Sequence, residues 1–248
     1  MKILFIVTQS EIGGAQRYLL ELTRYLSVQN KIAIAAGSGD KELFEMLHET
    51  CNMKHVTTHY IPHLVRALNP AKDIIALFAI LKLIKRERPD VLLLQSTKAG
   101  FLGALAGRIY KIYYYMLHVT CYMRIIYRIG GWSFRDPRSW WMNKILFYME
   151  KISAIWKDAI IVNSEFDKQL AIDKKISSTV KIVKIYNGID PNRMEFFNKE
   201  KARNALVSSI PPTGDLSCLR QTSRRDWPQG DKYSPYGGSL AGRQARVR

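Results

Sequence analysis

The stretch that most constrains the fold is the first one. Residues 3–7 are five consecutive apolar residues with no polar alternation. Such a run is typical of a strand whose two faces are both covered, as in a parallel sheet between layers of helices. Gly13 and Gly14 follow, and apolar residues then recur with helical spacing from Ala15 to Leu26. The pattern predicts a strand, a glycine turn and the start of a helix.

The glycine turn is a candidate phosphate site. Free amides at a helix N-terminus and the helix dipole favour an anion there, and residues without side chains let a ligand approach the backbone. The alternative is a plain tight turn in a β–α unit. Because Gln16 and Arg17 follow the glycines, the turn is neither the dinucleotide fingerprint nor a P-loop. An NAD-type oxidoreductase is therefore disfavoured.

Alternation of strand and helix patterns continues along the chain. Further strands are predicted at residues 31–37, 54–61, 91–94, 158–162 and 181–185, and helices at 40–50, 71–88, 101–110, 144–157 and 166–172. This order implies an α/β fold with a doubly wound, mostly parallel sheet and right-handed crossovers.

Ligands of such sheets bind beyond the carboxyl ends of the strands. Gly13 and Gly14 lie at one such end, and Ser96, Thr97 and Lys98 lie at another. Lys98 is a candidate point charge for an anion, and the alternative is an exposed lysine in a loop.

The formal net charge of +17 favours anionic partners: nucleic acid, anionic lipid or phosphorylated ligands. The alternative is a diffuse, solvated charge. No RNA-binding signature or zinc-finger spacing is found, so no nucleic-acid partner is expected. Cys51, Cys121 and Cys218 are isolated, which argues against disulfides and a cysteine zinc site and favours a reducing, cytoplasmic compartment. Neither a signal peptide nor a membrane span is expected.

The segment 113–128 is aromatic, apolar and basic at once. One interpretation is a strand followed by a buried helix. The other is an interfacial segment, because tyrosines and cations partition to the headgroup boundary of a membrane. His118 in this segment is a candidate catalytic residue, although a lone histidine in an apolar run is more often a core residue. The next stretch, 130–141, is rich in Gly, Pro and Trp and reads as a loop.

The composition changes near residue 206. Residues 206–248 are rich in Ser, Gly and Pro and show no apolar periodicity. The predicted organisation is a domain at 1–205 and a disordered or non-family tail at 206–248. The alternative for the tail is a small irregular subdomain.

Several of these pieces together resemble the N-terminal half of a GT-B glycosyltransferase of family 4 (group 1). The matching pieces are Ile12–Ala15, Arg88–Val91, Gly131–Phe134, Asp158–Glu165 and Tyr186–Asp190, in the family's order. The resemblance covers about residues 1–200. It implies a Rossmann-like GT-B N-terminal domain of a retaining transferase. It also implies a nucleotide-sugar donor, a sugar or lipid-linked acceptor, no cofactor and no required metal.

The resemblance also implies roles for residues. Gly13 and Gly14 would close over the donor phosphates, and Trp132 would lie near the acceptor. The residues expected to line the cleft are Ser96, Thr97, Lys98, Gly131, Trp132, Ser164, Glu165, Asn187 and Gly188. The family often has a histidine where this chain has Gly130, so no catalytic residue is assigned.

The family's second, nucleotide-binding domain is not found in this sequence. Too few residues follow Asp190 to form one, and no E-x7-E motif occurs among them. The chain is therefore expected to be a truncated or frameshifted transferase that is inactive alone. The alternative is a non-catalytic α/β module that binds anions or a membrane surface. Either form could lie peripherally on the inner membrane face.

Overall fold

The computed structural model describes residues 1–51, 53–188 and 198–208. The chain divides into two compact units, Met1–Ile189 and Asp190–Arg248. In the second unit the described element is the helix α7 (Lys199–Ser208). The tail predicted at 206–248 lies outside the described residues except for its first three, which belong to α7. The domain boundary at residue 205 remains a prediction.

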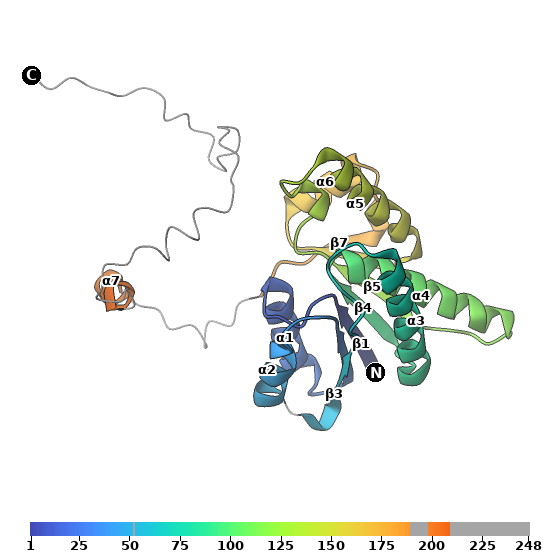
Figure 1. Ribbon diagram of the computed structural model, residues 1–248, viewed down its shortest axis with the longest axis horizontal. Helices are drawn as coiled ribbons and strands as arrows, with labels where there is room; N and C mark the ends of the chain where they lie inside the picture. The colour runs from blue at the N-terminus through green and yellow to red at the C-terminus, as the bar shows by residue number, and fades with distance from the viewer. Residues whose placement is uncertain (52, 189–197, 209–248) are drawn as a thin grey trace, which may run out of the picture. The chain divides into compact units, whose positions relative to one another are not determined.

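The first unit is built on one parallel sheet, with strand order β3-β2-β1-β4-β5-β6-β7 among the described residues (Figure 1). The strands are β1 (Lys2–Val7), β2 (Lys31–Ala36), β3 (Val56–Tyr60), β4 (Val91–Gln95), β5 (Arg124–Arg128), β6 (Ala159–Val162) and β7 (Ile182–Lys184). All six neighbouring pairs are parallel. This confirms the predicted doubly wound α/β fold.

Helices connect the strands in sequence. They are α1 (Gly14–Leu26), α2 (Glu42–Thr50), α3 (Pro70–Glu87), α4 (Thr97–Met116), α5 (Trp140–Ser153) and α6 (Glu165–Asp173). The chain builds outward from β1 to β3 and then returns to build outward from β4 to β7. Because right-handed crossovers in opposite directions place helices on opposite faces, α1 and α2 cover one face and α3 to α6 the other (Figure 1). The switch in direction lies between β1 and β4.

The first strand is buried on both sides, as its apolar run predicted. Leu4 and Ile6 belong to the core cluster that includes residues of α3 and α4. Phe5 and Val7 belong to the cluster that includes residues of α1 and α2. Alternate side chains of one strand therefore anchor both helix layers, and this fixes the carboxyl ends of the central strands as one edge of the molecule.

Helix α4 is longer than the sequence pattern predicted. It begins at Thr97, directly after β4, and ends at Met116, so Lys98 lies in its first turn rather than in a loop. Glycines bring this helix close to the sheet: a Cβ on Gly100 would lie 2.5 Å from the Tyr127 ring, and one on Gly103 would lie 2.3 Å from Leu94.

The aromatic segment 113–128 is therefore not a strand followed by a buried helix. Its first residues end α4, and its last five form the strand β5. Tertiary packing decides this, because small residues let α4 lie against β4 and β5 while its last turns extend past the edge of the core.

Helices α3 and α4 share a buried ion pair. Lys98 Nζ lies 2.5 Å from Asp73 Oδ1 and also donates to the carbonyl of Ala67. The Lys98 side chain is 7% exposed and that of Asp73 is 19% exposed. Removing one partner of such a pair leaves an uncompensated charge with little access to water, which is strongly destabilising.

We expect Lys98→Met and Asp73→Asn each to lower the free energy of unfolding by about 2–3 kcal/mol. The double variant should lose at least about 1 kcal/mol less than the sum, because each single change already breaks the pair. Urea unfolding of the four proteins measures this. The exposed pair Arg138–Asp136 is the control, and its cycle should show a coupling near zero. Additive losses at Lys98 and Asp73 would show that the pair is not coupled.

Candidate functional site

A cleft of about 950 Å³ opens at the carboxyl ends of the central strands. Its walls are formed by the end of β1, the start of α1, the loop before α3, the start of α4, the loop after β5 and one side of α5. Its lining residues are Val7, Thr8, Gln9, Gly14, Ala15, Gln16, Arg66, Ala67, Leu68, Ser96, Thr97, Lys98, Ser133, Asp136, Arg138, Met142, Leu146 and Met149. This is the position at which ligands of doubly wound sheets bind.

The glycine turn forms one wall of the cleft. Gly13 is the N-cap of α1, with extended backbone and no side-chain cap, and Gly14 is the first helical residue. Arg17 is the first residue whose amide reaches the Gly13 carbonyl, at 2.9 Å. A Cβ on Gly14 would meet nothing within 4 Å, and neither glycine has a positive φ. The glycines are therefore not required by strain in the turn, and Gly14 leaves open space beside helix-terminal amides that favour an anion.

Hydroxyl groups form the floor. The Ser96 and Thr8 hydroxyl oxygens lie 2.5 Å apart, and Thr8 Oγ1 also accepts from the amide of Ala99 at 3.3 Å. Thr97 Oγ1 donates to Ser133 Oγ at 2.9 Å. Ser96 has φ 80°, a conformation that costs energy in a residue with a side chain. The hydrogen bonds of Thr8 and Thr97 therefore join the end of β1, the start of α4 and the loop after β5. They surround Ser96, the strained residue that directly follows β4.

The cations of the cleft differ in how far their charge is compensated. Lys98 lies at the cleft as predicted, but its charge is already paired with Asp73. Arg138 pairs with Asp136 at 3.2 Å, and both side chains are exposed. Among the described residues no carboxylate lies within ion-pair distance of Arg66, which is also exposed. Arg66 is thus the better candidate for attracting an anion than Lys98.

Arg66 and the apolar wall of the cleft were not expected from the sequence. That wall consists of Leu68, Met142, Leu146 and Met149. Arg66 and Leu68 lie in a loop without periodicity, so no pattern marks them. Leu146 and Met149 were identified only as helical, and Met142 lies before the helix predicted at 144–157, whereas α5 begins at Trp140. Which turn of the helix faces the cleft depends on packing.

Trp132, expected near the acceptor, does not line the cleft. Its side chain is buried, its Nε1 donates to the carbonyl of Asp167 at 3.0 Å, and its ring stacks against Phe134. Trp132 therefore fastens the loop after β5 to α6.

Other expected lining residues also have local roles. Ser164 caps α6 by accepting from the amide of Asp167 at 3.0 Å. Glu165 is exposed and pairs with Lys184, whose ammonium lowers the pKa of the Glu165 carboxyl. Asn187 accepts from Arg128. Gly13, Gly131 and Gly188 are likewise absent from the cleft lining, whereas Gly14, Ser96, Thr97 and Lys98 are brought together there.

The cleft lining offers no acid–base pair. Among the described residues that line the cleft there is no histidine, and the one carboxylate, Asp136, is exposed and bound to Arg138. His118 lies at the far end of α4, in a separate pocket. Within the described residues no group of three or more His, Cys, Asp or Glu side chains could hold a metal ion.

A buried network positions α5 behind the cleft. Tyr127 donates to Glu150 Oε1 at 2.7 Å, while Lys157 Nζ lies 3.3 Å from Glu150 Oε2 and donates to Ser153 Oγ at 2.8 Å. Burial raises the pKa of the Tyr127 phenol and lowers that of the Lys157 ammonium. The network joins β5 to α5 and so fixes the helix that carries Met149.

Comparison with known proteins identifies relatives of this arrangement. The model of Glycosyltransferase Family 4 matches residues 12–193. An Escherichia coli UDP-Gal:alpha-D-GlcNAc-diphosphoundecaprenol alpha-1,3-galactosyltransferase is 26% identical over 174 residues, which are 70% of this chain and 42% of the relative. The O-antigen biosynthesis glycosyltransferase WbnH of Escherichia coli is 24% identical over 187 residues, 75% of this chain and 48% of the relative.

A solved structure shares the fold. The crystal structure of Anabaena HepE in complex with UDP-glucose superposes with a TM-score of 0.59 at 16% identity, covering 84% of this chain and 50% of HepE. The chain thus spans about half the length of the relatives that it matches. Because the family model covers most of the described sheet and its helices, the chain belongs to glycosyltransferase family 4.

Proposed function

We propose that the chain forms the N-terminal, acceptor-binding half of a glycosyltransferase that moves a sugar from a nucleotide-sugar donor with retention. The observation that carries the proposal is the cleft at the switch in strand direction, lined by Gly14 and by the hydroxyls of Ser96 and Thr97. The family match supports the proposal, in which this polar surface is where the donor phosphates meet the acceptor. The proposal involves no metal ion.

The glycine turn has the properties that a departing diphosphate requires. Its amides are free of side-chain caps, and Gly14 leaves their approach open. Donors that are held in place before the reaction stabilise developing charge without having to reorganise. The role proposed for Gly13 and Gly14 is therefore electrostatic stabilisation of the leaving diphosphate.

We propose a lipid-linked acceptor for the same cleft. The Escherichia coli relative is named for an acceptor sugar on diphosphoundecaprenol. The cleft of this chain combines an uncompensated cation, Arg66, with the apolar side chains of Leu68, Met142 and Met149. A diphosphate joined to a hydrocarbon chain presents the complementary charge and surface.

The transfer activity is tested in a chimera that joins this chain to the second half of the Escherichia coli galactosyltransferase, with UDP-galactose and a GlcNAc-diphosphate lipid. We expect transfer by the chimera, and the chain alone serves as the baseline. Gly14→Val should lower transfer by about 100-fold or more, the cost of losing one oxyanion-type donor. Its thermal midpoint should change little, because a Cβ at this position meets nothing within 4 Å.

Ala71→Val, in the first turn of α3, is the matched control and should keep both midpoint and transfer. A Gly14→Val chimera with full transfer would remove the turn from the mechanism. A chimera that folds but transfers no sugar, while the chain still binds anionic vesicles, would favour a non-catalytic binding module instead.

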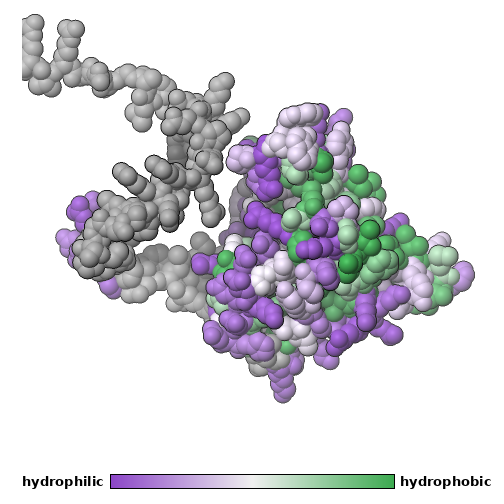
Figure 2. Space-filling model, in the orientation of Figure 1, coloured by the Kyte–Doolittle hydropathy of each residue, from purple (hydrophilic) through white to green (hydrophobic). Residues whose placement is uncertain are grey.

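We propose that the chain contacts a membrane through a surface formed by α3, α4 and the loop that follows α4. Its exposed apolar residues are Ile74, Ile75, Phe78, Ile109, Ile112, Tyr113, Tyr115, Met116, Leu117, Val119 and Tyr122. Figure 2 shows hydrophobic side chains gathered on the side of the molecule that these helices form. We call this set the α3–α4 face. An exposed apolar patch of this extent indicates an interaction site.

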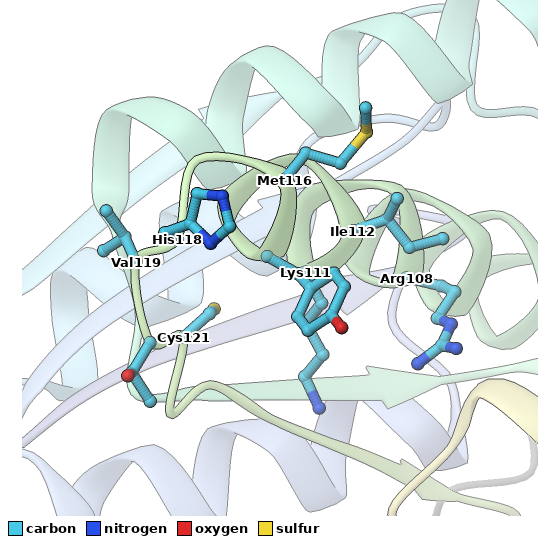
Figure 3. Close-up of a pocket in the computed structure, with 9 residues that line it drawn as sticks. Arg108, Lys111, Ile112, Met116, His118, Val119 and Cys121 are labelled. Atoms are coloured by element: carbon cyan, nitrogen blue, oxygen red, sulfur yellow. The ribbon is translucent and has the colours of Figure 1, made fainter.

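Cations border the α3–α4 face. Lys85 lies 4.6 Å from the centre of the Tyr113 ring, and Lys82 and Lys85 line a pocket of about 380 Å³ with Phe78. A second pocket, of about 860 Å³, lies between the end of α4 and the loop after it, where Arg108 and Lys111 project beside Ile112 (Figure 3). Tyrosines and cations around an apolar centre fit the headgroup boundary of an anionic membrane.

The described helices do not include one that combines the length and apolar character needed to cross a bilayer. We propose that the α3–α4 face rests on the inner face of the membrane, where a lipid-linked acceptor is available.

Cosedimentation with vesicles of phosphatidylglycerol and phosphatidylcholine tests this contact. We expect binding to anionic vesicles that weakens as salt rises, since exposed cations are screened. Tyr115→Ser with Met116→Ser should reduce binding by about tenfold, because each residue is mostly exposed and loses apolar area. Val28→Ser with Val180→Ser, similarly exposed but away from this face, should bind as wild type. Equal losses in both double variants would contradict a contact through α3 and α4.

A further inference from the structure

Arg128, the last residue of β5, is a buried cation without a counter-ion. It is 6% exposed, and among the described residues no carboxylate lies within ion-pair distance of it. Its Nη2 donates to Asn187 Oδ1 at 2.8 Å, and its guanidinium lies 3.8 Å from the centre of the Tyr18 ring. Burial lowers the pKa of this guanidinium, and the Tyr18 phenol opposes the shift. An amide and a ring position the charge, but they do not neutralise it.

A charge taken out of water without a partner is costly, and buried charges in proteins are therefore paired as a rule. The other buried cations of this chain follow the rule: Lys98 pairs with Asp73, and Lys157 pairs with Glu150. Arg128 departs from it. A cation without a carboxylate partner at the carboxyl edge of the sheet, the edge at which the cleft also opens, has the electrostatic form of an anion-binding site.

Two neighbouring side chains also have polar atoms without a hydrogen-bond partner among the described residues. Gln95 is the register partner of Arg128 on β4, is 1% exposed, and has no hydrogen-bond partner for either amide atom. Asn163, directly after β6, has an unpartnered Oδ1. We call Gln95, Arg128 and Asn163 the polar niche.

The niche faces α1. Leu93, two residues before Gln95, packs in the cluster of α1 and α2, and Arg128 stacks on Tyr18 of α1. Val162, the neighbour of Asn163, packs in the opposite cluster. Since side chains alternate along a strand, all three niche residues share the α1 side of the sheet at its carboxyl edge.

The niche is close to the glycine turn in the structure. Tyr18 follows Gly14 by about one turn of α1, so Arg128 lies one helical turn from the uncapped N-terminus. The free amides of that terminus and the guanidinium both favour negative charge. The amides at the start of α1 and the Arg128 guanidinium, both at the carboxyl edge of the sheet, therefore both favour an anionic ligand.

We propose that the polar niche binds a diphosphate, with Arg128 as the charged ligand and Gln95 as a hydrogen-bonding group beside it. This inference rests on the proposed function, because it adds a binding residue at the carboxyl edge of the sheet, where the cleft also opens. A diphosphate reaches this edge from two sources, the nucleotide-sugar donor and the lipid-linked acceptor. The shared chemistry is a phosphate oxyanion held by a guanidinium and an amide.

Calorimetric titration of the chain with inorganic pyrophosphate at constant ionic strength tests the niche. Arg128→Gln should weaken binding by at least tenfold, the loss expected for a charge-assisted hydrogen bond. Arg135→Gln is the control, because Arg135 also stacks on a ring, that of Phe166 at 4.4 Å, but is exposed and lies outside the niche. It should keep the wild-type affinity while changing the net charge equally.

The thermal midpoint without pyrophosphate separates binding from a structural role. Arg128→Gln should leave it unchanged or raise it, since a buried uncompensated charge is removed. A fall in affinity of less than tenfold, or no pyrophosphate binding by the wild type, would overturn the proposal. Gln95→Leu keeps the test valid if Arg128→Gln does not fold: it should raise the midpoint and weaken pyrophosphate binding, and unchanged binding would count against the niche.

Titrations with UDP and with geranyl diphosphate then identify the source. A loss for UDP alone in Arg128→Gln indicates the donor diphosphate, and a loss for geranyl diphosphate alone indicates the acceptor. A loss for neither overturns the proposal. Because these measurements use the chain alone, they stand apart from the transfer assay, whose failure would leave the pyrophosphate result intact.

Discussion

The structure depends on the parallel pairing of β1 with both β2 and β4. Five residues of β1 pair with β4 and all six pair with β2, and their side chains alternate between two helix layers. Because the chain reverses its direction of growth between β1 and β4, the loops after these strands diverge and leave an opening. The glycine turn and the Ser96–Thr97 start of α4 lie at that opening for this reason.

The cations of the domain fall into two groups, those with a carboxylate partner and those without one among the described residues. Lys98 and Lys157 are buried and paired, and their bonds fasten α3 to α4 and α5 to β5. Arg128 is buried and Arg66 is exposed, and neither has a carboxylate within ion-pair distance among the described residues. The paired cations hold helices in place, whereas Arg66 and Arg128 are the cations that we propose meet a ligand. The α3–α4 face belongs to the helix layer opposite α1 and α2, and it is the surface that we propose for contact with the membrane.

The sequence predicted the fold correctly because the signals that define the fold are local. Apolar runs without alternation marked the buried strands, and the order of strands and helices fixed a parallel sheet. It also recovered Gly14, Ser96 and Thr97 as cleft residues, since position at a strand end is enough to place them. It did not find Arg66 or the niche, because a loop arginine and a glutamine at the end of an apolar strand carry no pattern.

The sequence by itself determined the family and the parallel sheet, and with the sheet the edge at which a ligand would bind, since periodicity and residue order decide these. Only the tertiary structure decided the role of each polar side chain there. Lys98 and Trp132, both expected at the cleft, turned out to be an ion-paired lysine and a core indole. Arg128, the last residue of β5, turned out to be a buried cation with no carboxylate partner among the described residues. The reason is physical: whether a charge is free depends on which groups from distant segments surround it, and that is set by packing.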